Sequence, residues 1–215
     1  VGRDLFTHGL RETLQQFGEA DNFGSLIRPQ VGNVTDVLAT LEAKDMGGNL
    51  FLAETHQRVL RVLRMAEALS PRYAVVVANP PYMGGKGMNP RLSTWLKENY
   101  EPVKTDLFSA FVVRNLELAL PKGQLGFMTP FVWMFISSYE KLRAILIDQK
   151  TITSLIQLEY SGFDGATVPI CTFTVENAHK PDFRGGYVRL SDFRGADQQG
   201  PRALEIIQAA RKVGK

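Results

Sequence analysis

The sequence predicts an α/β domain with a mixed, mostly parallel sheet flanked by helices. From residue 73 onward, short apolar runs alternate with helical patterns, which is typical of such sheets. The uninterrupted apolar run at 74–78 is typical of a buried strand. The chain has 215 residues, 44% of them hydrophobic, and can therefore bury a sizeable core.

Apolar spacing, capping residues and turn residues locate the expected elements. Helices are expected over residues 4–17, 35–41, 50–68, 92–99, 105–120, 137–147 and 201–212, and strands over 73–78, 124–129, 152–158, 168–175 and 188–190. Residues 18–24 are expected to break the first helix. Thr105 is the expected N-cap of the helix over 105–120. Helices are expected on both faces of the sheet.

Composition excludes some classes of protein and leaves others open. The net charge of +3 permits nucleic-acid binding, but many proteins without that function are equally basic. The longest apolar stretch, 125–136, is shorter than the roughly 20 residues of a membrane span, so no membrane association is expected. The lone Cys171 cannot form an internal disulfide and suits a reducing cytoplasm, where we expect the protein. The three histidines are far apart, and no metal site is expected.

The tetrapeptide Asn79-Pro80-Pro81-Tyr82 follows the strand predicted at 73–78. Open α/β sheets bind ligands at the carboxyl ends of their strands. The Asn79 side chain and the Pro80 carbonyl each offer an oxygen there, and the proline rings restrict the backbone that carries them. Tyr82 adds an aromatic face. The pattern therefore suits a planar amino group and indicates methyl transfer to nitrogen.

The chemistry follows from the poor nucleophilicity of an exocyclic aromatic amine, whose lone pair is delocalised into its ring. Two oxygens that accept its N–H hydrogens favour a pyramidal nitrogen and stabilise the positive charge that develops during attack on a methyl sulfonium. Tyr82 could stack on the base. The alternative is structural, because two prolines after a strand also form an ordinary turn.

The motif resembles motif IV of amino-group methyltransferases that use S-adenosylmethionine. The longer string 79–89, followed by Lys104-Thr105-Asp106-Leu107-Phe108, resembles the adenine-specific (N6) DNA methyltransferases of the BREX and phage-growth-limitation (PglX-like) type. The resemblance implies a Rossmann-like fold, S-adenosylmethionine as cofactor, double-stranded DNA as substrate, and a role in phage defence or restriction-modification. Other phage-defence proteins are possible partners.

The resemblance also implies roles for individual residues. Asn79, Pro80, Pro81 and Tyr82 would form the catalytic motif around a flipped adenine, with Phe163 stacking on its other face. The implied cofactor-binding residues are Asp21, Phe23, Asn79, Asp106 and Phe108. Lys86, in a glycine-rich loop, could touch DNA phosphate.

Each of these roles has a structural alternative. Asp106 and Phe108 also suit a helix start and a core position. Phe163 also suits a packing role, and residues 21–26 could simply join two helices.

The resemblance implies a glycine-rich cofactor turn that is not visible before Asn79, so we expect a fragment that is incomplete at its N-terminus. We therefore expect the chain alone to bind the cofactor weakly or not at all. Residues 1–180 are expected to be the catalytic domain from motif IV to motif VIII, and 181–215 a connection to a following region. Two other functions remain open: a methyltransferase for rRNA or protein glutamine, and a non-catalytic DNA- or protein-binding subunit of a defence complex.

Overall fold

The computed structural model describes residues 2–44, 50–160 and 168–212, and it divides into two compact units, Val1–Arg72 and Tyr73–Lys215. This division falls at Arg72, whereas the sequence indicated a boundary near residue 180. Each unit is described by itself. In the described ranges, no helix combines the length and the apolar character that crossing a membrane requires.

The first unit is helical in its described part. Its elements are α1 (Gly2–Phe17), α2 (Ala20–Phe23), the 3-10 turn η1 (Gly24–Leu26), α3 (Val34–Glu42) and α4 (Leu50–Leu69). Residues 21–26, for which a loop joining two helices was one of two interpretations, lie in α2 and η1. The Thr13 hydroxyl of α1 accepts hydrogen bonds from the backbone N–H groups of Gln30 and Val31, both at 3.0 Å, and so fixes the segment before α3.

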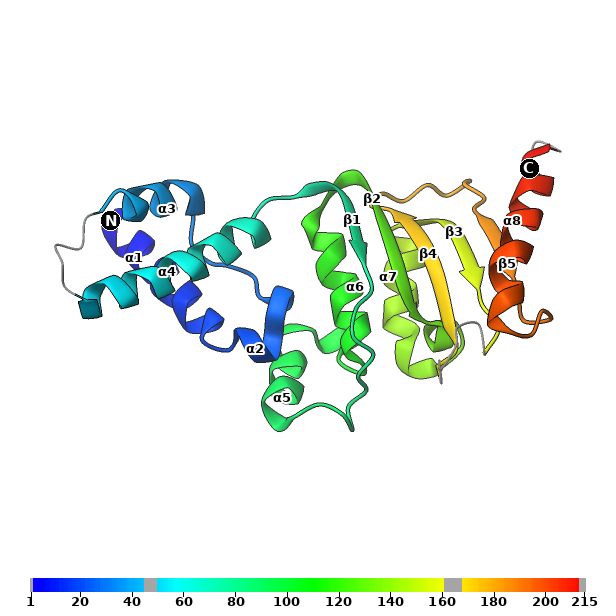
Figure 1. Cartoon of the computed structure of the whole chain (residues 1–215), viewed down its shortest axis with the longest axis horizontal. Coiled ribbons are helices and arrows are strands. Elements are labelled where there is room, and N and C mark those ends of the chain that lie inside the picture. The colour runs from blue at the N-terminus through cyan, green and yellow to red at the C-terminus, as the bar shows by residue number, and fades with distance from the viewer. Residues whose placement is uncertain (1, 45–49, 161–167, 213–215) are drawn as a thin grey trace. The chain divides into compact units, whose positions relative to one another are not determined.

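The second unit contains a five-stranded sheet in the order β1-β2-β4-β3-β5 (Figure 1). Its strands are β1 (Tyr73–Ala78), β2 (Ala119–Pro130), β3 (Thr151–Gln157), β4 (Ile170–Glu176) and β5 (Gly186–Arg189). β1 pairs parallel with β2 and β3 pairs parallel with β5, whereas β4 is antiparallel to both β2 and β3. Strand β4 therefore runs against the other four, which makes the sheet mixed and mostly parallel, as expected.

Helices and 3-10 turns connect these strands. They are α5 (Pro90–Asn99), η2 (Glu101–Val103), α6 (Leu107–Leu118), η3 (Phe131–Met134), η4 (Ser137–Tyr139), α7 (Glu140–Asp148) and α8 (Ala196–Lys212). Helix α6 packs on β1 and β2, and α7 packs on β3. The unit is thus the predicted α/β domain.

The two faces of the sheet differ in burial. One face carries Leu125, Phe127, Phe173, Val175 and Leu155, which are all buried. On the other face, Val75 and Val77 of the edge strand β1 are 62% and 77% exposed. The expectation of helices on both faces therefore does not hold at β1.

Two boundaries were predicted wrongly for identifiable reasons. Helix α6 is capped by Asp106, because its carboxylate accepts from the Phe108 N–H at 3.2 Å, while the Thr105 hydroxyl donates to the Ser138 carbonyl. Strand β2 begins at Ala119, within the helix expected over 105–120 and before the strand expected over 124–129. Ala119 pairs with Tyr73, and the register then shifts until Gln124 pairs with Val75.

Residues after 180, expected to be a connection, contribute to this second unit. Tyr187 of β5 pairs with Leu155 of β3. The buried Gln199 side chain of α8 accepts from the Glu159 N–H at 3.0 Å. This region is therefore tied to the sheet by strand pairing and by a buried polar contact.

Candidate active site at the carboxyl edge of the sheet

Asn79 follows β1 directly, and its side chain lies at the sheet edge where β1 and β2 both end. Val76 pairs with Leu125 and Ala78 with Phe127, so the residues after Ala78 lie beside Met128 at the end of β2. Asn79 is exposed, whereas Pro80 is buried. The rigid part of the motif is thus anchored in the fold, and the carboxamide faces solvent.

Tyr82 holds the Asn79 side chain. Its hydroxyl donates to Asn79 Oδ1 at 2.9 Å and lies 3.2 Å from the Met128 carbonyl, a second acceptor. Burial raises the pKa of Tyr82, with a smaller contribution from Cys171, so the hydroxyl stays protonated and remains a donor. An amide oxygen has two lone pairs, and Oδ1 can therefore accept one further hydrogen bond.

Asp106 ties the motif to the start of α6. Its Oδ1 accepts from the Met83 N–H at 3.0 Å as well as from Phe108, and the Leu107 N–H donates to the Met83 carbonyl at 3.0 Å. Gly84 forms a short antiparallel bridge with Asp106. Burial raises the pKa of Asp106, although the backbone N–H donors oppose that shift. The Asp106 carboxylate thus fixes the chain just after Tyr82.

Phe108 is a core residue in this structure. Its side chain is fully buried, and its ring lies 5.5 Å from that of Tyr139. Burial and the nearby Asp106 carboxylate raise the pKa of Tyr139 to about 12. These contacts favour the packing role of Phe108 over a direct contact with a cofactor.

The other expected site residues lie elsewhere. Asp21 and Phe23 belong to α2 of the first unit, where Asp21 is exposed and Phe23 is 3% exposed. Lys86 is exposed in a turn that the Gly87 N–H closes on the Gly84 carbonyl at 2.8 Å. Phe163 lies outside the described residues. The described geometry therefore brings together Asn79, Pro80, Tyr82 and Asp106 from the expected set.

Two contributors to the site were missed by sequence reasoning. The Met128 carbonyl gave no signal, because every residue has one. The bond from Asp106 to the Met83 N–H joins residues 23 positions apart, which no local pattern reveals. The capping role of Asp106 was indicated only by the interpretation that this residue lies at the start of a helix.

Two of the three cofactor residues expected in the second unit have structural contacts. The Asp106 carboxylate is engaged by backbone N–H groups, and the Phe108 ring is fully buried. Asn79, the third expected cofactor residue of this unit, is exposed. No cluster of three or more His, Cys, Asp or Glu suited to a metal was found among the described residues.

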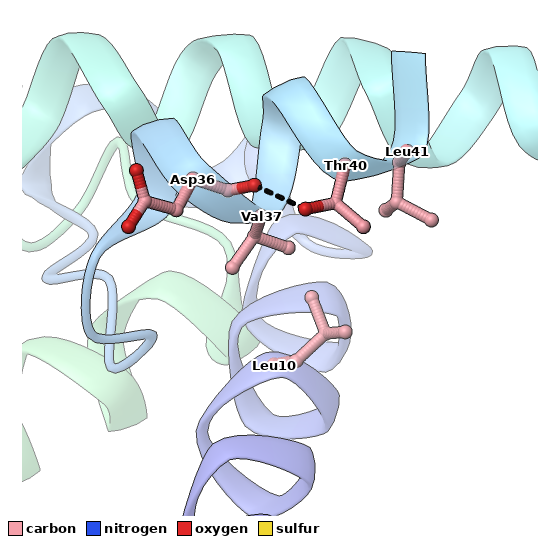
Figure 2. Close-up of a pocket in the computed structure, with 5 residues that line it drawn as sticks. All are labelled: Leu10, Asp36, Val37, Thr40 and Leu41. Atoms are coloured by element: carbon pink, nitrogen blue, oxygen red, sulfur yellow. Dashed lines mark hydrogen bonds between the residues drawn. The ribbon is translucent and has the colours of Figure 1, made fainter. Parts of the chain in front are cut away.

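A small cavity lies in the first unit, away from these residues in the sequence. It has a volume of about 190 Å³ and is lined by Leu10 of α1 and by Asp36, Val37, Thr40 and Leu41 of α3 (Figure 2). Its hydrogen bond, from the Thr40 hydroxyl to the Asp36 carbonyl at 2.7 Å, is internal to α3. The cavity contains none of the expected site residues.

Comparison with known proteins agrees with this fold. A solved structure of the Type ISP restriction-modification enzyme LlaGI, a nuclease-deletion mutant in complex with a DNA substrate mimic, superposes with a TM-score of 0.50 and 15% identity. That match covers 81% of this chain and 16% of LlaGI. The chain thus shares an α/β fold with part of that enzyme.

The family is defined by a direct sequence match. The model of the Eco57I restriction-modification methylase family matches residues 40–163, which is more than half of the chain. The chain belongs to this family.

Two curated relatives match most of the chain. The adenine-specific methyltransferase BrxX of Escherichia coli O9:H4 (strain HS) is 32% identical over 88% of this chain, and the adenine-specific methyltransferase PglX of Lacticaseibacillus casei (strain Zhang) is 29% identical over 96%. The chain spans only 17% and 18% of the lengths of these relatives.

Proposed function

We propose that this chain forms the base-binding part of a DNA adenine-N6 methyltransferase that acts in phage defence or restriction-modification. The observation that carries the proposal is the exposed Asn79 carboxamide at the carboxyl edge, held by the Tyr82 hydroxyl at 2.9 Å. The relatives BrxX and PglX are named adenine-specific methyltransferases, which supports adenine as the acceptor. The proposed partners are double-stranded DNA and other phage-defence proteins.

The proposed chemistry uses two oxygens of this chain. Asn79 Oδ1 keeps one lone pair that accepts one N–H of the adenine amino group, and the Pro80 carbonyl accepts the second N–H. Because both acceptors are positioned before the reaction, they stabilise the positive charge on nitrogen without reorganisation. The methylated nitrogen can lose its proton late, so no strong base is required. S-adenosylmethionine would supply the electrophilic methyl group.

The roles proposed for aromatic residues complete this arrangement. Tyr82 would stack on one face of the extruded adenine and Phe163 on the other. Base extrusion costs a few kcal/mol, which stacking contacts of about 1–3 kcal/mol each can offset. Lys86, exposed in its turn, is placed to reach solvent and is proposed to contact phosphate.

The proposal is tested by offering different acceptors to the longest natural protein that contains this chain. Duplex DNA, rRNA and a release-factor peptide are each incubated with labelled S-adenosylmethionine, and the products are analysed by mass spectrometry. We expect label at adenine N6 of the DNA. Label on rRNA or on glutamine would replace the proposed substrate, and label on no acceptor would favour a non-catalytic subunit.

A further inference from the structure

Two large apolar side chains are exposed where the chain leaves β2. Phe135 is 66% exposed and Ile136 is 47% exposed. They follow η3, whose Trp133 is buried against Phe173 of the sheet, with the ring centroids 5.1 Å apart. The exposed apolar pair Phe135–Ile136 therefore stands on a segment that is anchored in the core.

Hydrogen bonds fix the backbone that carries this pair. Arg143 Nη1 of α7 donates to the carbonyls of Trp133 and Ile136, both at 2.7 Å. The N–H groups of Phe135 and Ile136 donate to the Val132 carbonyl at 3.1 and 3.0 Å. The pair is thus exposed on a turn whose backbone is fixed by hydrogen bonds.

The turn belongs to the same sheet edge as the Asn79 motif. η3 begins directly after β2, whose end lies beside Asn79, and the Tyr82 hydroxyl approaches the Met128 carbonyl three residues before η3. On the other side of the turn, the Thr105 hydroxyl donates to the Ser138 carbonyl at 3.4 Å, next to the Asp106 that holds the motif. The apolar pair and the motif are therefore parts of one rim.

We propose that Phe135 and Ile136 contact the base stack of duplex DNA beside the extruded adenine, with Phe135 occupying the space that the base leaves. This inference rests on the proposed function. An apolar side chain inserted at a base step compensates for lost stacking and favours a distorted duplex. A pair of exposed apolar residues on a fixed turn at the rim of a base-binding site suits that role.

The test compares two DNA substrates, once the target adenine has been mapped in methylated DNA. In one duplex the target faces thymine, and in the other it faces an abasic site, where extrusion costs less. Methylation rates are measured for the longest natural protein containing this chain and for its F135A, F135W and F183A variants. Phe183 is a matched control, because it is also a partly exposed phenylalanine, with an exposed fraction of 46%. It lines a cavity of about 350 Å³ beside Thr151 and Ile152, at the amino end of β3.

We expect F135A to slow methylation of the paired target by roughly tenfold or more and to regain most of the rate on the abasic duplex. F183A should match the wild type on both substrates, and F135W, which keeps a large aromatic side chain, should retain more of the rate on the paired target than F135A. A wild-type rate of F135A on the paired target would overturn the inference, and so would an equal loss on both substrates, as expected if Phe135 serves only the fold or a protein partner. If the proposed function itself fails, mapping finds no methylated adenine in DNA, which overturns both statements before the variants are compared.

Discussion

At the scale of single residues, the notable feature of the site is that Tyr82 and Asn79 hold each other. The hydroxyl donates to the same oxygen that is proposed to accept the adenine N–H. This bond orients the carboxamide so that its oxygen, rather than its NH2 group, has a fixed position. Tyr82 therefore has a positioning role that is separate from the proposed stacking role of its ring.

The variants Y82F and Y82A separate these two roles. Y82F keeps the ring but loses the hydrogen bond to Asn79, so we expect kcat to fall about tenfold, as for the loss of one hydrogen bond of about 1.4 kcal/mol. Y82A also loses the aromatic face, and we expect it to weaken base extrusion as well. Fluorescence of 2-aminopurine at the target position measures extrusion. A wild-type kcat in Y82F would show that the hydroxyl has no positioning role, and equal effects of Y82F and Y82A on kcat and on fluorescence would show that the ring has no separate role.

The sequence was informative for residues with a local signature and uninformative for the others. The Asn-Pro-Pro-Tyr string after an apolar run predicted the position of Asn79 at the end of β1, and the structure places it there. Whether Phe108 serves a pocket or the core depends on tertiary packing, and its ring is fully buried. The roles assigned to Lys86, Phe163, Asp21 and Phe23 stay predictions.

At the scale of elements, Asp106 connects helix α6 to the motif segment. Its carboxylate caps the helix through Phe108 and accepts from Met83, so one side chain stabilises two parts of the site. This arrangement predicts that an uncharged acceptor at position 106 can replace the carboxylate, whereas a methyl group cannot.

Stability measurements on D106N and D106A test this prediction. D106A loses both acceptor bonds and should lower the free energy of unfolding by about 1–2 kcal/mol, as for other lost N-caps. Burial raises the pKa of Asp106 above its ordinary value of 3.8, so the stabilising contribution of this group is complete below that pH and declines as pH rises through its higher folded-state pKa. D106N has no such titration and should gain stability relative to the wild type as pH rises from about 4 to 7.

Urea unfolding of the three proteins across that pH range provides the measurement. A difference between D106N and the wild type that stays constant with pH would show that the carboxylate is not destabilised by burial. A loss in D106N as large as that in D106A would show that the charge itself is required.

The type of each element was predicted better than its first and last residues. The strands at 73–78 and 151–157 were located within a residue, because their apolar runs are bounded by turn residues. The pairing of β5 with β3 could not be predicted from a four-residue segment with little apolar pattern. The sequence suggested that the last helix starts at Pro201, because proline is compatible with the first turn of a helix. In the structure α8 begins at Ala196, and Pro201 lies inside it.

At the scale of the whole molecule, β1 is an edge strand with two exposed valines, Val75 and Val77. Amino acid order alone did not show this, since a buried strand and an exposed edge strand can share the same apolar composition. The second unit presents the Asn79 motif at one edge of its sheet, while Asp106 caps α6 and Phe108 packs in the core.

Because Asp106 and Phe108 have structural contacts, we predict that the 215-residue chain alone binds S-adenosylmethionine weakly or not at all. Calorimetric titration of the isolated chain should give no saturable heat at micromolar concentrations of cofactor. A dissociation constant in the micromolar range would contradict this prediction and would indicate that residues of this chain suffice for the cofactor.

The central claim is that the Asn79 oxygen stabilises the reacting amine. The most direct measurement is the rate of adenine-N6 methylation by N79A and N79D in the longest natural protein containing this chain, together with DNA affinity. We predict that N79A lowers kcat by about 10²–10³-fold while DNA affinity changes by less than about twofold, and that N79D, which keeps an acceptor oxygen, retains more activity than N79A. Equal losses of affinity and turnover in N79A, or wild-type turnover without the amide oxygen, would contradict the account.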